Sequence, residues 1–445
     1  MHVRSPASLL VFLVFFVLLA GSGSACSSDS PPSTPGGSSG SSGSTDGGGG
    51  GSIIEGGGAG RPDNPTACGA TDAAGVRGCV SKDRYTEDVT FIAGDMRAPG
   101  SPHARATGDR CAAVLSAHGF TVERHAYGSG TNIVGTLPGT TAATEVVVAG
   151  AHYDHLDGCL GADDNATGVA GMLELARVLS GHTHPRTLVV ACWDEEERGE
   201  IGSRAWVKRA KSTDTNVVQY VNFDMIGYAK SEPNSQQMPS TYKDIYRKEY
   251  AALEARQFKG DFLWTFYDKR SRPFVRALEE QSAAVSRAEL GVQVPTALLS
   301  RVELQNTDHA GFWAAGFPAA HIGDTGDLRN PNYHCKQSAD TLATLDHDYA
   351  ADIVRAATAA TWTMLEGKAP AAEPGPGVAS CTQFCARASS FGAKEGACMK
   401  AVFDVLGVQP PASCASVTSP ASCNTCAADL KINDLQCEGL ADLCL

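Results

Sequence analysis

The chain has 445 residues, of which 42% are hydrophobic and 19% are charged, a balance typical of a soluble globular protein. Its 49 acidic and 36 basic residues give a formal net charge of −13. Because binding to phosphate groups needs clustered Lys and Arg, this charge argues against nucleic acid and anionic membrane as partners.

Two segments are predicted before the folded part. Residues 1–25 resemble an export signal, with Arg4 near a positively charged start and small residues at the end. The apolar run between Leu9 and Ala20 is too short for a membrane span, which needs about 20 residues. Residues 26–66 are rich in Ser, Gly and Pro and too poor in apolar side chains to pack, so a linker is predicted there.

Cys26 bears on how the exported chain is held. A lipid-anchored Cys followed by a flexible tether would have this sequence. The bacterial lipoprotein signal usually has Leu three residues before the Cys, whereas this chain has Gly23 there. We expect export, and the sequence leaves two alternatives open: secretion, or a lipid anchor at Cys26 on the bacterial cell envelope.

Residues 67–368 are predicted to form the main domain. Two continuous apolar runs, Glu145–Gly150 and Thr187–Trp193, indicate strands covered on both faces, and Val217–Phe223 and Pro318–Ile322 are predicted as a third and a fourth strand. Two segments have helical spacing of apolar residues: Gly168–Leu179 and Tyr349–Leu365. Their alternation predicts an α/β fold, a three-layer sandwich with a mixed, largely parallel central sheet. Ligand sites in such folds lie at the carboxyl ends of the strands.

A first polar cluster, His152-Tyr153-Asp154-His155, follows the first predicted strand. An imidazole at this position can bind a metal ion, and a carboxylate two residues later can hold the other ring N–H. Taken alone, the cluster is more often a hydrogen-bonded polar turn than a metal site.

A second cluster, residues 161–168 (GADDNATG), opens the first predicted helix. Its acids could simply cap the helix, but two adjacent acids are more than capping requires. One of Asp163 and Asp164 can therefore cap the helix while the other reaches across two cations. We interpret the glycosylation sequon at Asn165 as incidental.

Four consecutive acids, Asp194 to Glu197, follow the second predicted strand. Such a run usually lies on a solvated surface, and Glu195 is interpreted as facing solvent. The preceding apolar strand nevertheless drives at least one of these acids toward the sheet edge. Because a buried carboxylate cluster is unfavourable without cations, the position argues for a bound metal.

Asp224 ends the third predicted strand, and His334 closes the segment 330–334 (NPNYH), with Asp340 shortly after it. Each of these residues alone is more often structural than functional. With the earlier clusters they give two imidazoles and three carboxylates near successive strand ends. Such mixed nitrogen and oxygen ligands suit zinc, and also manganese or cobalt.

A second linker is predicted at residues 369–379, followed by a small Cys-rich module at residues 380–445. The module contains eight of the 15 cysteines: Cys381, Cys385, Cys398, Cys414, Cys423, Cys426, Cys437 and Cys444. Export and the absence of His among them favour four disulfides over a zinc site, and the pairing stays open.

The order of the motifs resembles that of the co-catalytic zinc aminopeptidase family. The motifs are H-x-D, G-A-D-D-N, E-E with a following G-x-x-G-S, F-D-M and Y-H, between about Tyr85 and Glu366. The family includes bacterial leucyl aminopeptidases, and glutamate carboxypeptidase II and glutaminyl cyclase are relatives. Each motif is weak by itself, but five of them in this order are a specific signal.

The resemblance implies two zinc ions (Zn²⁺) held by five side chains. One zinc would be held by His152 and Asp224, the other by Glu197 and His334, with Asp164 bridging both. In the family's E-E pair the first acid is the general base and the second a ligand. The segment 199–203 (GEIGS) matches the G-x-x-G-S anchor and makes Glu196 the base rather than Glu195. Asp154 would be the partner of His152, and residues 307–309 (TDH) resemble a segment near the site without a ligand role.

The implied reaction is hydrolysis of the N-terminal residue of a peptide. Zinc would polarise the scissile carbonyl and activate water, and Glu196 would take the proton of that water and pass it to the leaving amine. A carboxypeptidase or a glutaminyl cyclase of the same fold stays open as an alternative. A non-catalytic binding ectodomain is disfavoured because all five ligand positions are filled. The preferred side chain and the oligomeric state stay open.

The loop after His334 departs from the family pattern, because the segment Cys335–Ala339 before the next Asp-Thr is longer than usual. Cys335 is adjacent to His334, and Cys159 lies in the loop after His152. A disulfide between these cysteines would brace the loop. The alternatives are other partners or free thiols.

Overall fold

The computed structural model describes residues 68–239, 242–294, 299, 306–368, 380–388, 411–414, 417–431 and 437. The predicted export signal, both predicted linkers and Cys26 lie outside these residues. Within the described part, no helix combines the length and the apolar character needed to cross a bilayer.

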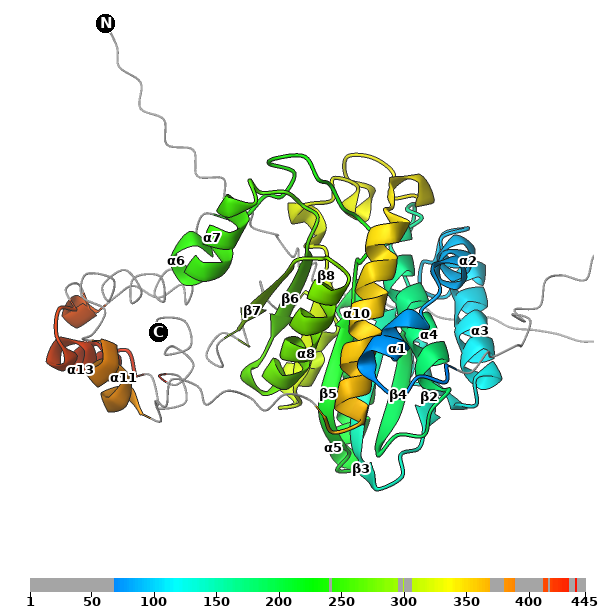
Figure 1. Ribbon diagram of the computed structural model, residues 1–445, viewed down its shortest axis with the longest axis horizontal. Coiled ribbons are helices and arrows are strands. Elements are labelled where there is room, and N and C mark those ends of the chain that lie inside the picture. The colour runs from blue at the N-terminus through cyan, green and yellow to red at the C-terminus, as the bar shows by residue number, and fades with distance from the viewer. Residues whose placement is uncertain are drawn as a thin grey trace, which may run out of the picture. The chain divides into compact units, whose positions relative to one another are not determined.

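A mixed eight-stranded sheet forms the centre of residues 68–368 (Figure 1). In sheet order the strands are β1 (Thr121–Ala126), β2 (Thr131–Leu137), β4 (Arg186–Trp193), β3 (Ala142–His152), β5 (Asn216–Phe223), β8 (Ala319–Gly323), β6 (Leu263–Tyr267) and β7 (Glu289–Gln293). Strands β4, β3, β5 and β8 run parallel to one another, whereas β2 is antiparallel to β4 and β6 to β8. The four strands predicted from sequence are thus the parallel centre of the sheet.

Helices form a layer on each face of this sheet (Figure 1). Side chains alternate along β3, so that Val147 and Ala149 face one layer whereas Val146 and Val148 face the other. The first layer contains α2 (Lys82–Ile92), α3 (Pro102–Ala117), α4 (Gly168–Leu179), α8 (Arg272–Ala284) and α10 (His347–Leu365), with α1 (Ala73–Gly78) against α10. The second contains α5 (Ile201–Ser212) and α9 (His309–Ala314), while α6 (Tyr242–Ile245) and α7 (Arg247–Ala255) accompany β6 and β7. The predicted α/β sandwich is confirmed.

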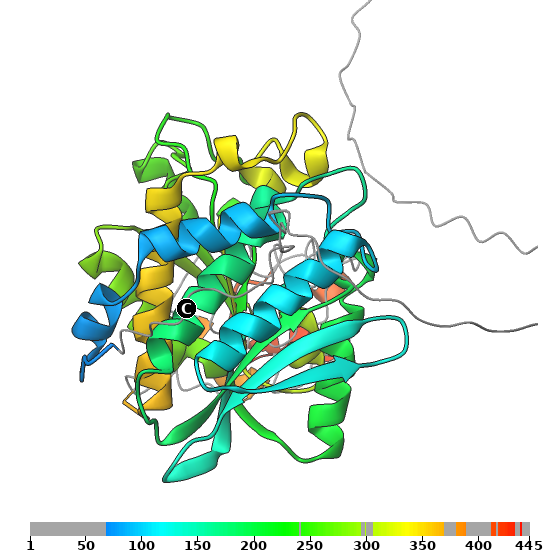
Figure 2. The same cartoon turned by 90° about the vertical axis from the view of Figure 1, so that its right-hand side faces the viewer.

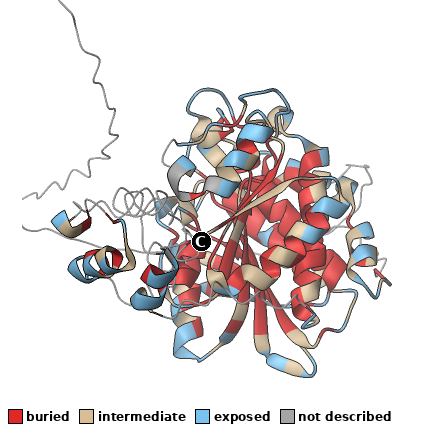
Figure 3. Cartoon of the chain, turned by 60° about the vertical axis from the view of Figure 1, so that its left-hand side comes forward, coloured by how far each residue is buried: buried red, intermediate tan, exposed pale blue. Residues whose placement is uncertain are grey.

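The central elements owe their strong sequence signal to burial. All 12 residues of α4 are buried, and Figure 3 shows buried residues gathered in the central sheet and the helices that pack on it. The hairpin of β1 and β2 lies at one edge of the sheet beside α3 (Figure 2), and most of β1 is exposed or half-buried. Edge strands carry a mixed pattern because one side faces solvent, which explains why β1 has no continuous apolar run.

The C-terminal module is rich in disulfides, as predicted. Its described part contains α11 (Cys381–Ala388) and α13 (Pro420–Asp429). The disulfides are Cys381–Cys437, Cys385–Cys423 and Cys414–Cys426. Cys398 and Cys444 lie outside the described residues. Phe384 and Val417 pack with these cysteines in a core of their own, which is small, so cross-links are expected to carry much of its stability.

Candidate metal centre

The predicted site residues lie together at the carboxyl ends of neighbouring parallel strands. His152 is the last residue of β3, and it pairs with Trp193 at the end of β4. Asp224 directly follows β5, and the turn Glu196–Arg198 follows β4. Because parallel strands end at the same edge of a sheet, residues far apart in sequence meet there.

Asp164 lies between two imidazoles. It belongs to the helical turn Ala162–Thr167 that leads into α4. Its Oδ1 atom is 3.4 Å from Nε2 of His152, and its Oδ2 atom is 3.3 Å from Nε2 of His334. The two oxygens of one carboxylate therefore face two different histidines, which is the arrangement that a bridging ligand requires.

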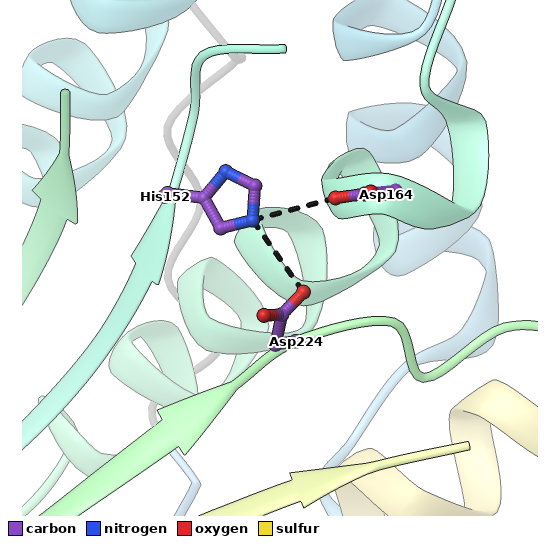
Figure 4. Close-up of side chains that lie close together, drawn as sticks. All are labelled: His152, Asp164 and Asp224. Carbon is purple, nitrogen blue, oxygen red and sulfur yellow. Dashed lines mark ion pairs between the residues drawn. The ribbon is translucent and has the colours of Figure 1, made fainter. Parts of the chain in front are cut away.

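Two groups of possible ligand atoms share Asp164. In the first, Nε2 of His152 is also 3.4 Å from Oδ1 of Asp224, and Figure 4 shows the ring directed at both carboxylates. In the second, Oε2 of Glu197 is 3.3 Å from Nε2 of His334. His155 joins this second group, because its Nδ1 atom lies 2.8 Å from Oε1 of Glu197. All five predicted ligands are thus brought together, with one imidazole that was not assigned from sequence.

Asp154 contacts both His152 and the acidic turn Glu196–Arg198, but its carboxylate does not hold the ring N–H of His152 as predicted. The N–H at Nδ1 of His152 meets the backbone carbonyl of Asp154 at 3.2 Å, whereas the nearest carboxylate oxygen is 3.7 Å away. That carboxylate instead accepts the backbone N–H groups of Glu196 at 2.9 Å and Glu197 at 3.2 Å. Asp154 therefore fixes the tautomer of His152 through its backbone and orients the acidic turn through its side chain.

The two glycines of the G-x-x-G-S motif hold the acidic turn in place. Gly199 has a φ of 101°, in the left-handed region that favours glycine. A Cβ atom at Gly202 would lie 2.3 Å from both the amide oxygen of Asn132 and the carbonyl of Asp194. Close backbone packing beside the site therefore requires glycine at both positions. This requirement fixes the distance in sequence between the motif and the acids.

Glu195 does not face solvent, contrary to the expectation from sequence. Only 1% of it is exposed, and its backbone is left-handed, with a φ of 60°. Its carboxylate accepts hydrogen bonds from Ser129 and Arg198. These contacts direct it away from the histidines, toward a structural role.

The site carries an excess of negative charge. Burial by itself lowers the pKa of His152, but Glu196 and Asp224 outweigh it and raise that pKa well above its ordinary value. Burial likewise opposes protonation of His334, yet Asp164 and Glu197 raise its pKa to about 9. The negative charge that raises the pKa of these two imidazoles would also stabilise a bound cation.

Buried polar atoms at the site are incompletely satisfied by hydrogen bonds among the described residues. One is Nε2 of His155; its other ring nitrogen, Nδ1, is instead ion-paired with Oε1 of Glu197 at 2.8 Å. Leaving such atoms unpaired costs about 1–3 kcal/mol each, and more for charged groups. The donor set, the charge excess and these unpaired atoms all fit metal ions bound between the carboxylates and imidazoles.

Loops that carry the site are tied together by residues with little or no signal in the sequence. The buried guanidinium of Arg97 donates to the carbonyls of Tyr153 at 3.0 Å and Gly161 at 2.7 Å. The Asp340 carboxylate accepts the backbone N–H of Asp164 at 3.1 Å. A lone Arg in a loop has no pattern that would mark it, whereas Asp340 was visible as the acid after His334.

Asp163 is not a helix cap. It is fully buried, and its carboxylate accepts hydrogen bonds from the N–H of Gly227 at 2.8 Å and the amide of Asn330 at 2.6 Å. Asn165 instead accepts, through its Oδ1 atom, the N–H of Gly168 at the start of α4, at 3.0 Å. The first acid of the pair thus fastens the loop, and only the second reaches the histidines.

Cys159 and Cys335 form a disulfide, one of the alternatives left open by the sequence. The bond links the loop after β3 to the turn Tyr333–Cys335, which contains His334. His334 itself has a φ of 55°. A non-glycine residue in this region is strained by about 1–3 kcal/mol and persists where its surroundings hold it, as this cross-link does.

A model of peptidase family M28 matches residues 132–361. The uncharacterized protein YfbL of Escherichia coli K12 is 30% identical over 223 residues, covering 47% of this chain and 64% of that protein. A probable zinc metalloprotease of Pyrenophora tritici-repentis is 26% identical over 256 residues, covering 54% of this chain and 52% of that protein. The chain thus spans between about half and two thirds of these curated relatives.

Solved structures share the fold. The LapA aminopeptidase of Legionella pneumophila superposes with a TM-score of 0.53 at 18% identity, over 66% of this chain and 74% of that one. At this identity the likeness concerns the arrangement of strands and helices. It agrees with the mixed sheet and the two helical layers described above.

Proposed function

The chain belongs to peptidase family M28, and on this premise we propose that it is a two-zinc exopeptidase that removes the N-terminal residue of peptides. The observation that carries the proposal is the position of Asp164. Its two carboxylate oxygens lie 3.4 Å and 3.3 Å from the Nε2 atoms of His152 and His334, as a residue shared by two ions requires. A single-ion site would need only one of these contacts.

The proposed ligands divide into two sets around the shared Asp164. His152 and Asp224 complete the first set, and Glu197 and His334 complete the second. Bound zinc supplies a Lewis acid that polarises the scissile carbonyl and lowers the pKa of the attacking water. The chain's own part is to hold these donors in place through the backbone hydrogen bonds described above.

Glu196 is the proposed general base. Burial raises its pKa well above the ordinary value, and the carboxylates of Asp308, Asp224 and Glu197 add to this shift against the opposing effect of His152. A carboxylate next to the ligand Glu197 can take the proton of the attacking water and then return it to the leaving amine. Its backbone N–H, held by Asp154, keeps the turn at a fixed distance from the ligands.

We also propose that the enzyme works outside the cytoplasm, either secreted or lipid-anchored at Cys26. The support is the number of disulfides, since Cys68–Cys79, Cys111–Cys192 and Cys159–Cys335 join those of the C-terminal module. Disulfides persist in oxidising compartments and are rare in the cytosol. Mass measurement of the mature chain from its native host separates a lipid-modified N-terminus from an unmodified one.

Hydrolysis of a panel of aminoacyl-nitroanilides, with and without a chelator, tests the activity. We expect cleavage of substrates with a free α-amine, no cleavage of their N-acetylated counterparts, and loss of activity on chelation. Elemental analysis should find close to two zinc ions per chain. Release of C-terminal residues would instead indicate a carboxypeptidase, and cyclisation of N-terminal Gln a glutaminyl cyclase. An active enzyme without metal would contradict the proposal.

Three matched Glu→Gln variants test the role of Glu196. Glu196→Gln keeps the shape of the side chain but removes the proton acceptor, so it should retain zinc while kcat falls by roughly 10²–10⁴-fold. Glu197→Gln should weaken zinc binding, because an amide is a poorer ligand than a carboxylate. Glu195→Gln should keep both zinc and kcat, since the carboxylate of Glu195 accepts hydrogen bonds from Ser129 and Arg198. An inactive Glu195→Gln with zinc intact, beside an active Glu196→Gln, would place the base one residue earlier.

A further inference from the structure

One disulfide of the main domain lies directly beside the proposed zinc site. Cys335 follows the ligand His334 in the chain, and its partner Cys159 lies between β3 and the turn that carries Asp164. The two cysteines are 176 residues apart in sequence, so the bond joins two loops that are otherwise distant in the chain. Because Cys335 is the chain neighbour of His334, opening this bond can act on a ligand directly.

The two ends of the disulfide are held very differently. Cys159 is only 3% exposed, and nearby the carbonyl of Gly161 accepts a hydrogen bond of 2.7 Å from the buried guanidinium of Arg97. Cys335 is half-buried, and residues 336–339 that follow it are all exposed. The disulfide therefore fastens an exposed loop to a loop that is held by hydrogen bonds of its own.

The backbone of the turn that contains His334 is strained. The φ angles of His334 and Cys335 are 55° and 54°, both in the left-handed region. Two successive non-glycine residues keep such a conformation only where their surroundings hold it. The backbone N–H of Cys335 donates to the carbonyl of Asn332 at 2.7 Å, but this bond lies within the same segment and moves with it. The disulfide is a covalent link from this turn to a different loop.

The same disulfide also supports the bridging ligand. Sγ of Cys335 accepts the backbone N–H of Asp340 at 3.4 Å. The Asp340 carboxylate in turn accepts the backbone N–H of Asp164 at 3.1 Å. The segment 335–340 therefore connects the disulfide to His334 and to Asp164, which are both proposed ligands of the second zinc ion.

We propose that the Cys159–Cys335 disulfide is a redox control of the second zinc position, which binds zinc tightly when the bond is closed and weakly when it is open. The proposal rests on the two-zinc site and adds regulation to it. The first position is built differently, because His152 ends β3 and Asp224 directly follows β5, two strands inside the sheet. Opening the disulfide leaves these strand ends in place, so the second ion is affected more than the first.

A dithiol reductant opens the bond in two steps of thiol–disulfide exchange. A thiolate of the reductant attacks Sγ of the half-buried Cys335, and Sγ of Cys159 leaves and takes up a proton. The second thiol of the reductant then displaces Cys335, which also takes up a proton, and the reductant becomes a cyclic disulfide. The protein gains the two electrons and two protons that the reductant loses. Exchange with a disulfide oxidant reverses these steps, so an oxidising compartment keeps the enzyme in its zinc-binding form.

The double variant Cys159→Ser/Cys335→Ser tests the proposal without substrate. Competition with a fluorescent zinc chelator should show one of the two zinc ions weakened by about 10–100-fold, the range for residues that support a ligand. The other ion should change less. In the metal-free protein, hydrogen–deuterium exchange should become faster in residues 333–340, because the turn is released even where no zinc is bound.

Cys68→Ser/Cys79→Ser is the matched control. This disulfide also joins a buried cysteine, Cys68, to a half-buried one, Cys79. Cys68 lies against Gly181, just beyond the C-terminal end of α4, whereas Asp164 precedes the other end of that helix. The control should keep both zinc affinities. Unchanged affinities in Cys159→Ser/Cys335→Ser, or a weakening that the control reproduces, would overturn the proposal.

Reduction of the unmutated protein tests whether the control is reversible. A phosphine reductant is used, because thiols bind zinc themselves. Zinc affinity should fall to that of Cys159→Ser/Cys335→Ser and return after reoxidation, while mass mapping of alkylated thiols shows which cysteines were opened. A bond that stays closed in the folded protein, or zinc that binds equally or more tightly after reduction, would contradict redox control. If the double variant fails to fold, this experiment decides by itself.

The zinc measurements are separate from the activity assay. A protein whose second ion depends on the disulfide, but which cleaves no aminoacyl substrate, would reject the proposed function and leave the redox control in place. An active two-zinc aminopeptidase whose zinc affinities ignore the disulfide would reject the redox control alone. A chain that binds only one zinc ion would reject both.

Discussion

Replacing Arg97 should be among the most damaging single changes in this protein. Its buried guanidinium makes four short hydrogen bonds to backbone carbonyls, those of Ile92 at 3.1 Å, Tyr153 at 3.0 Å, Leu160 at 2.5 Å and Gly161 at 2.7 Å, besides a longer one of 3.4 Å to the carbonyl of Asp164. Of the four short bonds, two go to the loop that carries Asp164 and a third to the segment after β3. Arg97→Met keeps most of the apolar length of the side chain but removes every donor.

The size of the effect follows from these contacts. A hydrogen bond to a charged group contributes about 1.5–3 kcal/mol, so four such bonds amount to about 6–12 kcal/mol. Against this stands the cost of burying the cation, which is several kcal/mol and also lowers the pKa of Arg97 to about 10. A net loss of about 3–6 kcal/mol is expected, a large part of the roughly 5–15 kcal/mol of a typical domain.

Urea unfolding of the metal-free protein, followed by tryptophan fluorescence, measures this loss. Arg97→Lys should recover only a minor part of it, because one ammonium group cannot reach all four carbonyls. Arg124→Met is the control: its exposed pairing with Asp109 should contribute no more than about 1 kcal/mol. Zinc affinity should fall in Arg97→Met, since the loops it joins carry ligands. A loss below about 1 kcal/mol, equal to that of the control, would refute the reasoning.

Three further outcomes are expected. Asp164→Asn should lose zinc from both positions, whereas Asp163→Asn should be less stable but keep its zinc; equal zinc loss in both would mean that the wrong acid is assigned as the bridge. Mass mapping without reduction should find no free thiol among the eight cysteines of the C-terminal module, and several free thiols would reject the disulfide prediction. Burial raises the pKa of Glu289 from 4.5 to about 8, so the folded chain retains a proton that the unfolded chain loses. Stability of the metal-free protein should therefore fall as the pH rises from about 4.5 to 8, and Glu289→Gln should flatten that slope in urea unfolding at each pH.

The centre of the fold was predictable from sequence because its elements are buried on every side. Strands β3, β4, β5 and β8 lie inside the sheet; β3 and β4 end in continuous apolar runs, and β5 and β8 are largely apolar. Helix α4 has the bounds that its spacing predicts. The flanking strands β1, β2, β6 and β7 were not predicted. A short run such as Leu263–Tyr267 is compatible with either a strand or part of a buried helix until its neighbours are known.

The residues of the site also divide into those that the sequence predicted and those that only the tertiary structure showed. The types and order of the proposed ligands stood in the sequence, because strand ends concentrate polar side chains and the G-x-x-G-S anchor sets the register of the acids. Which acid of each pair points inward was visible only by analogy, and the inward turn of Glu195 was not foreseen. The place of His155 beside Glu197 and the four carbonyls bound by Arg97 came from the tertiary structure alone. A local sequence pattern reflects the surroundings of a residue within its own segment. These contacts instead join loops that follow different strands, and the packing of the whole sheet decides which loops meet.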